Sequence, residues 1–217
     1  MIEVNHINHM GDDLTVVNAA RVSFGKKSSY MPRVHMGEPK VLRFEDDKLI
    51  KYLAKHKHIS PFGHCFASFH VKAPVFVARQ LVKHKFLRWN EISRRYVDVD
   101  AELYEAPVWR GRSVDKKQGS DGTVESNFNI KYYNTKALMA YEQLLNEGVA
   151  PEQARMVLPQ SMMTEWYWSG SLDAFVDMCN LRCTDDTQRE SRIVADVIDK
   201  EMERLFPVSW SALRHAS

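Results

Sequence analysis

The segment from Cys65 to His84 constrains the fold most, because its pattern of apolar residues changes period partway along. From Cys65 to Val71 apolar side chains occupy every second position, which predicts a strand with one buried face. Pro74 suits the first turn of a helix. The helical period that follows has an apolar side with Val75, Ala78, Leu81 and Val82, and a polar side with Arg79, Gln80, Lys83 and His84. The chain therefore needs both strands and helices.

The rest of the sequence alternates between the same two kinds of element. Further strands are expected at residues 2–7 and 162–168, and helices at 12–20, 44–56, 129–148, 151–157, 172–182 and 187–206. Residues 25–39 are expected to form a loop, and 109–127 an exposed, poorly ordered loop or insertion. That loop is too short to separate two domains. We expect one domain over residues 1–217, of the α+β class, with a mainly antiparallel sheet flanked by helices.

Composition and charge exclude several classes of protein. The 217 residues are 44% hydrophobic and 27% charged, as in ordinary globular chains. No apolar run approaches the ~20 residues of a membrane span, and the amino terminus lacks the pattern of a secretory signal. We therefore expect a cytoplasmic protein without a membrane partner. A net charge of +2 is too small for a general nucleic-acid binder.

The cysteines and histidines give no metal or disulfide motif. Cys65, Cys179 and Cys183 are odd in number and lack paired metal spacing. Cys179 and Cys183 lie one helical turn apart and are interpreted as packing residues. The histidines at 56, 58 and 64 have no carboxylate or cysteine at ligand spacing, so they are interpreted as hydrogen-bonding or packing groups. No metal is expected.

The segment from Arg79 to Tyr96 carries the strongest chemical signal. It holds six cationic side chains, one carboxylate, one histidine, two amides and a hydroxyl. Arg and Lys supply charge-assisted donors for phosphate, and Asn90, Glu91 and Ser93 can read the hydroxyls and ring edges of a nucleotide. Two other interpretations remain open: a solvated basic helix end, or a nucleic-acid surface on which Trp89 and Tyr96 stack with bases.

The order of these residues resembles the signature of the flavin-dependent thymidylate synthases. That signature is Arg-His-Arg, seven residues, then Ser, closed by Asn-Glu-x-Ser-x-Arg-Tyr. This chain has Lys83-His84-Lys85, seven residues and Ser93, with residues 90–96 in register. Further segments resemble the family in the same order, at 55–64, 71–80, 154–159 and 179–190. Four ordered motifs at compatible spacing are far more specific than one short pattern.

The resemblance implies a set of binding residues. Those implied to hold deoxyuridine monophosphate (dUMP) are Gln80, Leu81, Val82, Lys83, Glu91, Ile92, Ser93, Arg94, Arg95, Arg155 and Arg182. Those implied to contact flavin adenine dinucleotide (FAD) are Ser60, Lys83, His84, Lys85, Glu91, Ser171, Asp173 and Asp177, with Ser23 as a weaker candidate. Taken alone, Arg155 is explained equally well as a helix-surface ion pair, and Arg182 as a favourable charge at a helix end.

The resemblance also implies a reaction. The methylene carbon of methylenetetrahydrofolate passes to carbon 5 of the uracil ring, reduced FAD delivers the hydride that completes the methyl group, and NADPH reduces the flavin. Carbon 5 is a poor nucleophile unless negative charge can develop on nitrogen 3 and oxygen 4. Arg182 is the expected catalytic residue, because a fixed guanidinium stabilises that charge. A homotetramer with active sites shared between subunits is implied as well.

Several positions depart from the family pattern. Lys83 and Lys85 stand where the family has arginine. A planar guanidinium with several donors is thus replaced by an ammonium, which acts as a point charge. Arg88 and Gly63 stand where the family usually has a small residue and Glu. Asp173 and Asp177 stand where it often has Arg and Asn. Thymidylate remains the expected product, and the alternative is a flavoenzyme of the same fold that modifies another deoxyuridine nucleotide.

Overall fold

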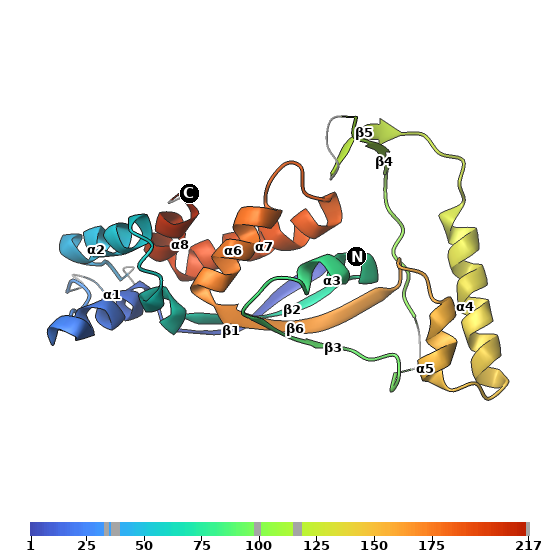
Figure 1. Cartoon of the computed structure of the whole chain (residues 1–217), viewed down its shortest axis with the longest axis horizontal. Helices are drawn as coiled ribbons and strands as arrows, with labels where there is room; N and C mark the ends of the chain where they lie inside the picture. The colour runs from blue at the N-terminus through green and yellow to red at the C-terminus, as the bar shows by residue number, and fades with distance from the viewer. Residues whose placement is uncertain (33–34, 36–39, 98–100, 115–118, 216–217) are drawn as a thin grey trace.

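A four-stranded antiparallel sheet forms the centre of the computed structural model (Figure 1), which describes residues 1–32, 35, 40–97, 101–114 and 119–215. Its strand order is β1–β2–β6–β3. The strands are β1 (Glu3–Met10), β2 (Phe66–Pro74), β3 (Leu87–Glu91) and β6 (Met163–Ser171). Every neighbouring pair is antiparallel. The expected α+β fold with an antiparallel sheet and flanking helices is confirmed.

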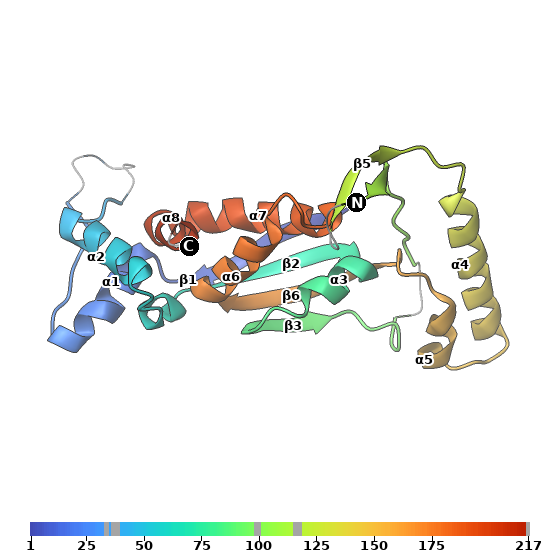
Figure 2. The same ribbon diagram turned by 45° about the horizontal axis from the view of Figure 1, so that its top comes forward.

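Three helices cover one face of this sheet. They are α3 (Val75–Leu81), α6 (Leu172–Arg182) and α7 (Arg189–Leu205), seen in front of the strands in Figure 2. Phe69 and Trp168 point into this layer, and each ring meets Phe175 of α6 edge to face, with centroids 5.3 and 5.7 Å apart. These three aromatic side chains are buried and form the middle of the core.

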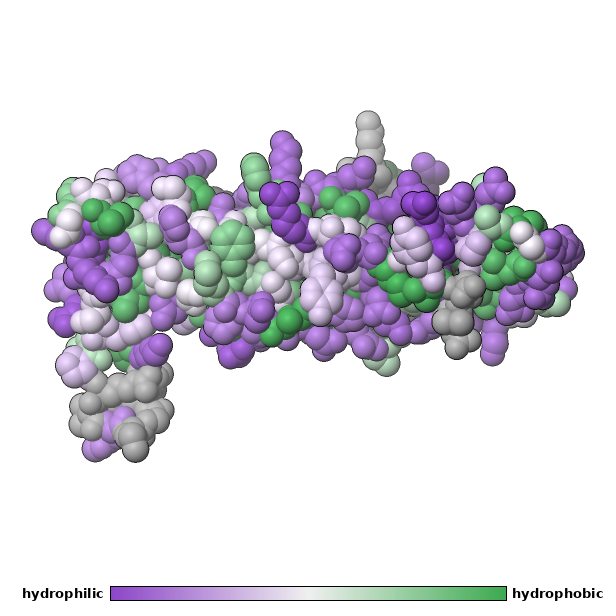
Figure 3. All heavy atoms as spheres, turned by 90° about the horizontal axis from the view of Figure 1, so that it is seen from below, coloured by the Kyte–Doolittle hydropathy of each residue, from purple (hydrophilic) through white to green (hydrophobic). Residues whose placement is uncertain are grey.

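The opposite face of the sheet is open in the single chain. Figure 3 looks onto this side and shows pale and hydrophilic residues mixed across the strands. His70 pairs with Glu165 at 2.9 Å, and Ser68 hydrogen-bonds Ser169 at 2.8 Å, so alternate residues of β2 and β6 carry polar groups. Tyr167 lies on the same face and is 53% exposed.

One end of the sheet is closed by helices α1 (Asp13–Arg21), α2 (Phe44–Lys55) and α8 (Pro207–Arg214), with the short 3-10 helices η1 (Val22–Phe24) and η2 (Ser60–His64). Asp12 caps α1 by accepting from the Thr15 amide at 3.0 Å. Asp13 accepts from the amides of Val208 and Ser209 at 3.0 and 2.8 Å, which joins the start of α1 to the start of α8.

Beyond the other end of the sheet, residues 101–114 and 119–160 form a separate lobe (Figures 1 and 2). The lobe contains β4 (Trp109–Arg112), β5 (Ser120–Val124), α4 (Ile130–Asn146), α5 (Pro151–Ala154) and η3 (Arg155–Val157). Strands β4 and β5 pair antiparallel. Within α4 only Asn134 and Tyr141 are buried, whereas Tyr132, Tyr133 and Met139 are each 54% exposed.

The structure corrects several sequence-based expectations. The expected loop at 109–127 is exposed but contains the β4–β5 hairpin, and its residues 115–118 lie outside the described part, as do 33–34 and 36–39 of the expected loop at 25–39. Strand β3 was not expected, because its polar residues were interpreted as a helix end. Helix α8 was also missed. The expected helix at 151–157 divides into α5 and η3.

Helix α3 also differs from its expected form. Pro74 is the last residue of β2 and the N-cap of α3 rather than its first helical residue. The helix ends at Leu81, and Val82, expected on the packed side, is 43% exposed. Among the described residues, no helix is long and apolar enough to cross a membrane.

Candidate functional site

An open pocket of about 1010 Å³ lies where α3, the end of α6 and the lobe meet. Its walls come from α3, from residues 104–110, from the β4–β5 hairpin and from residues 181–190. Four cationic side chains and two carboxylates line it: Arg79, Lys83, Arg110, Arg182, Asp186 and Glu190. The excess of cations favours an anionic ligand, and the volume is that of a small-molecule site.

Arg182 is held in place by His84. The Arg182 side chain leaves the last turn of α6, and its Nε donates a hydrogen bond to Nε2 of His84 at 3.0 Å. Burial, and then the charge of Arg182, lowers the pKa of His84 to about 4, so the imidazole is neutral near pH 7 and can accept this bond. Arg182 itself remains cationic. The two terminal nitrogens of its guanidinium stay available to a ligand.

Gln80 is fixed by a hydrogen-bond chain from the start of α7. Ser191 Oγ donates to Gln80 Oε1 at 3.2 Å, and the Gln80 amide nitrogen donates to Oε1 of Gln188. Gln188 in turn donates to Oε2 of Glu190 at 3.2 Å. Ser191 and Gln188 therefore hold the Gln80 side chain in place on the pocket wall formed by α3. We call Gln80, Lys83, His84 and Arg182 the pocket cluster.

Four of the other expected dUMP residues carry polar side chains outside the pocket, and we call them the lobe-side cluster: Glu91, Ser93, Arg95 and Arg155. Arg95 pairs with Glu152 of α5 at 3.5 Å, and Arg155 Nε donates to the Glu152 carbonyl at 3.3 Å. Both arginines are largely exposed. None of the four lines the pocket. Within one chain the structure therefore divides the expected dUMP ligands into two clusters.

Glu91 is positioned as a hydrogen-bond acceptor. Thr164 Oγ1 donates to one of its oxygens at 2.6 Å, and Trp89 Nε1 donates to the other at 3.1 Å. Trp89 is itself stacked on Trp166, with ring centroids 4.3 Å apart. Arg94, three residues past β3, is nearly buried, and its Nη1 lies 3.5 Å from the Val97 carbonyl oxygen. Leu81 is buried in the core, so only its backbone can meet a ligand.

The expected flavin residues are divided between the two ends of α6. Lys83 and His84 lie at its last turn, beside Arg182, and Glu91 lies at the far end of β3. Three other segments meet near the first turn of α6. Ser60 begins η2, and the backbone amide of Leu172 donates to the Cys65 carbonyl at 2.8 Å, just past the end of η2. The turn after Lys85 passes against β6 so closely that a Cβ at Gly170 would lie 2.4 Å from Leu87. Ser171 is the N-cap residue of α6, without a side-chain capping hydrogen bond, and Asp173 and Asp177 occupy the first two turns of the helix.

The groups at this end of α6 fit a flavin nucleotide. Lys85 carries a charge suited to the diphosphate, and carboxylates suit ribose hydroxyls. Oδ1 of Asp173 is buried without a hydrogen-bond partner among the described residues. Burial, and then the charge of Asp173, raises the pKa of Asp177. A hydroxyl donor from a bound ligand would satisfy the Asp173 oxygen, because a buried acceptor without a partner is unfavourable.

Some residues of the site were missed or stay unplaced. Tyr104 and Arg110 line the pocket but lie in or beside a segment expected to be a loop, so their sequence gave no signal. Arg79 was assigned to the free side of its helix without a role. Ser23 lies in η1, directly after α1, and Figure 1 places α1 at the end of the molecule opposite to the hairpin. Ile92 is half-buried and Val82 exposed.

The structure is an α+β fold with a cationic pocket suited to an anionic ligand, and comparisons with known proteins identify its family. Residues 6–208 match the family model described as thymidylate synthase complementing protein. The chain is 39% identical over 212 residues to a flavin-dependent thymidylate synthase of Thermus thermophilus, covering 96% of this chain and 74% of that one. A Kosmotoga olearia protein with the same description is 39% identical over 209 residues, covering 94% and 86%.

Solved structures agree with this assignment. A UMP/dUMP methylase, PolB from Streptomyces cacaoi, bound with 5-Br UMP superposes with a TM-score of 0.83 at 28% identity, covering 100% of this chain and 95% of that one. With 5-Br dUMP bound, the TM-score is 0.80 at 29% identity, covering 98% and 94%. The chain belongs to the flavin-dependent thymidylate synthase family.

Proposed function

We propose that this enzyme methylates dUMP to thymidylate with methylenetetrahydrofolate as the carbon donor, FAD as the bound cofactor and NADPH as the reductant. Family membership supports the flavin dependence and the methylation of dUMP. The observation that carries the mechanism is the contact between His84 and Arg182 on the wall of a cationic pocket. Reduced FAD, when bound, supplies the hydride that completes the methyl group.

Arg182 has the central role in this mechanism. Negative charge must develop on the uracil ring before carbon 5 can attack, and a guanidinium that is already oriented stabilises that charge without reorganisation. His84 fixes Nε of Arg182, so the outer nitrogens keep one direction. Gln80, held by Ser191 and Gln188, supplies amide groups beside Arg182 in the same pocket. Here the protein acts by orientation and charge.

The lobe-side cluster is suited to anchoring the substrate phosphate. Arg95 and Arg155 are exposed cations a short distance from one carboxylate residue, Glu152, and Ser93 adds a hydroxyl. Because this cluster and the pocket cluster do not share a pocket within one chain, we propose that a complete dUMP site combines the two clusters from different subunits. A homotetramer provides such pairs through its symmetry.

Product analysis under anaerobic conditions tests the reaction. The protein is loaded with FAD, reduced with NADPH, and mixed with methylenetetrahydrofolate and dUMP, and the nucleotide formed is identified by mass. Thymidylate together with oxidised flavin is expected. If saturating FAD changed neither the thermal midpoint nor its own fluorescence, the flavoenzyme proposal would be wrong, because a ligand that binds only the native state must stabilise it. A nucleic-acid module would instead bind single-stranded oligonucleotides.

A second candidate is methylation of UMP as well as dUMP, because the two solved structures compared above are of a UMP/dUMP methylase. The same anaerobic assay with UMP in place of dUMP separates these functions. We expect turnover with dUMP to exceed that with UMP, in line with the more similar relatives in Thermus and Kosmotoga. Equal rates would favour the broader activity.

Mixing variants tests the shared site. Ser93→Ala removes a group of the lobe-side cluster, and Arg182→Ala removes one of the pocket cluster. If each site joins the two clusters from different chains, dissociating, mixing and reassembling the two inactive variants should restore part of the activity. Light scattering that showed an active monomer would contradict the proposal. A single domain over residues 1–217 and a cytoplasmic location also stay predictions.

A further inference from the structure

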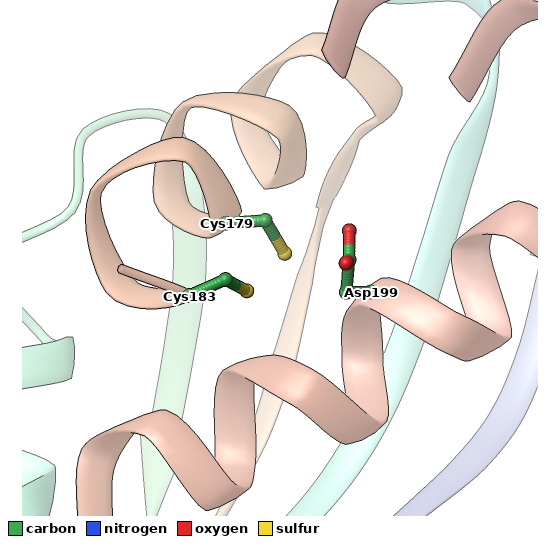
Figure 4. A group of neighbouring side chains, drawn as sticks. All are labelled: Cys179, Cys183 and Asp199. Carbon is green, nitrogen blue, oxygen red and sulfur yellow. The ribbon is translucent and has the colours of Figure 1, made fainter. Parts of the chain in front are cut away.

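Two thiols and a carboxylate meet between α6 and α7, outside the pocket. Figure 4 shows Cys179 and Cys183 on the last turns of α6, with their sulfur atoms directed toward Asp199 of α7. The two sulfurs and a carboxylate oxygen all lie within 4.8 Å of one another. Neither the pocket cluster nor the lobe-side cluster includes these residues. We propose that Cys179, Cys183 and Asp199 bind a thiophilic divalent ion of the zinc class.

The distances suit such an ion. A tetrahedral ion with bonds to sulfur of about 2.3 Å sets its sulfur ligands ~3.8 Å apart. The observed separations therefore need only small side-chain rotations to close around an ion. A disulfide fits less well, because side chains one helical turn apart have Cβ atoms about 5–6 Å apart, whereas a disulfide needs about 3.5–4.5 Å. Forming one would unwind the end of α6.

The surroundings of Asp199 complete the site. Trp210 Nε1 and Arg214 Nε each donate to its Oδ1 at 2.9 Å, and Arg214 Nη2 lies 3.4 Å from Oδ2. Such contacts orient a ligating carboxylate. They leave Oδ2 with the weaker contact and free to approach an ion. The charges also balance. Two thiolates and one carboxylate are negative, and a divalent ion and the Arg214 guanidinium carry an equal positive charge.

Burial limits how the ion enters and what it must displace. Cys179 is fully buried, whereas Cys183 is partly exposed and the Asp199 side chain is 29% exposed. The ion would enter from the side of Cys183 and Asp199, and solvent would complete a four-coordinate shell. Both thiols must release their protons to solvent on binding. Burial raises the pKa of the Cys179 thiol, which weakens but does not prevent this exchange.

The site would hold the segment that carries Arg182. Arg182 lies between the two cysteines in the last turn of α6, and its side chain reaches His84 on the pocket side. An ion bound to α6 and α7 together would tie that turn to the following helix. Sequence spacing did not reveal the site, because Asp199 lies on a different helix and only the fold brings it to the thiols.

Cadmium titration of the full-length protein tests the proposal. The protein is stripped with a chelator, kept reduced with a phosphine under anaerobic conditions, and titrated with Cd²⁺ while the ultraviolet thiolate-to-cadmium absorption is followed. We expect saturation at one ion per chain, displacement by Zn²⁺, and a higher thermal midpoint with Zn²⁺ bound. Absence of a saturating thiolate band in the wild-type protein would overturn the proposal.

Three variants assign the ligands. Cys183→Ser changes the partly exposed thiol, and circular dichroism would verify its fold; we expect it to weaken Cd²⁺ binding by at least tenfold, and Asp199→Asn to do so by about tenfold or more. Cys65→Ser is the matched control, because Cys65 is buried elsewhere against the Asp12 carbonyl. Wild-type affinity in Cys183→Ser or Asp199→Asn, or equal loss in Cys65→Ser, would contradict the assigned site.

Discussion

The sheet-centred body buries its apolar side chains in a core, whereas the lobe exposes many of its own. The main hydrophobic cluster joins β2, β6, α1–α3 and α6–α8, with Val4 of β1 packed against it, and draws none of its members from the described residues of the lobe. The lobe instead exposes a row of aromatic side chains, in which Phe128 stacks on Tyr133 with centroids 4.7 Å apart and Trp109 meets Phe128 at 6.4 Å. The body is stabilised by its own core, and the lobe is not.

This difference bears on the active site. Gln80 and Arg182 of the pocket cluster stand on α3 and α6, elements anchored in the core, and Lys83 and His84 lie in the turn after α3. Arg95 and Arg155 of the lobe-side cluster follow β3 and α5 and are exposed. A group that must stabilise developing charge needs a fixed position, and a phosphate anchor tolerates more movement. Exposed aromatic surface on a helix with few buried residues is typical of a subunit contact. The lobe is therefore proposed to gain its packing from another subunit.

The largest expected effect is a cavity in the body. Phe175→Ala should lower the free energy of unfolding by about 3–5 kcal/mol, because Phe175 is fully buried between Phe69 and Trp168. Urea unfolding followed by tryptophan fluorescence measures the change. A loss below about 1 kcal/mol would mean that the cluster under the sheet is less well packed than the structure indicates.

Arg182→Lys should have the next largest effect, on turnover rather than stability. An ammonium cannot reproduce the planar donors, so nucleotide-dependent flavin reoxidation should slow by about 100-fold or more. Flavin reduction by NADPH should stay near the wild-type rate and serves as the internal control. Normal reoxidation and normal product would show that Arg182 is only a favourable charge at the end of α6.

Arg155→Ala should affect binding rather than chemistry. Arg155 is an exposed residue of the lobe whose Nε contacts only the Glu152 backbone among the hydrogen bonds described for it, so its loss removes an anchoring contact. We expect the KM for dUMP to rise by about tenfold with kcat largely kept, so that high substrate restores the rate. Steady-state kinetics at several dUMP concentrations measures the split. A fall in kcat equal to that of Arg182→Lys would contradict the proposal that the lobe-side cluster acts in binding and the pocket cluster in chemistry.

Much of the body could be predicted from the sequence, because its elements repeat a clear period. The alternation from Cys65 to Val71 belongs to β2, and the helices around 44–56, 172–182 and 187–206 lie close to their expected bounds. Strand β3 was missed for a physical reason. Its residues Arg88 and Asn90 lie on the open face of the sheet beside Ser169 and Tyr167. Because this face is solvated, the strand has the polar, basic composition that is typical of a loop.

The site was predictable as a set of residues but not as an arrangement. The contact from Arg182 to His84 joins positions 98 residues apart, and the chain from Gln80 to Ser191 joins positions 111 apart. Neither pairing follows from local spacing, because tertiary packing alone brings α3 against the ends of α6 and α7. The division into two clusters could not be predicted either, because residues 80–95 are continuous in sequence, and only the fold shows that Gln80 and Lys83 line the pocket while Glu91, Ser93 and Arg95 do not.

The burial of His84, together with its contact to Arg182, should make the body sensitive to acid. The pKa of His84 is about 4 in the folded chain against an ordinary 6.5, so the unfolded chain takes up its proton first as the pH falls. The free energy of unfolding should therefore decrease from about pH 6.5 to about pH 4. In His84→Gln, where no proton is taken up at this position, urea titrations at a series of pH values should show a smaller decrease. Identical pH profiles for both proteins would contradict the buried neutral imidazole.

Met139→Ala should have the smallest effect on the single chain and so gives the sharpest test of the contrast between body and lobe. Met139 is 54% exposed on α4, and its truncation in a solvated lobe should change the free energy of unfolding by no more than about 0.5 kcal/mol. If another subunit covers this surface, the loss should appear as weaker assembly instead. Thermal midpoints and light scattering over a range of protein concentrations separate the two, because only assembly depends on concentration. A large loss that did not vary with concentration would mean that the lobe has a core of its own within one chain.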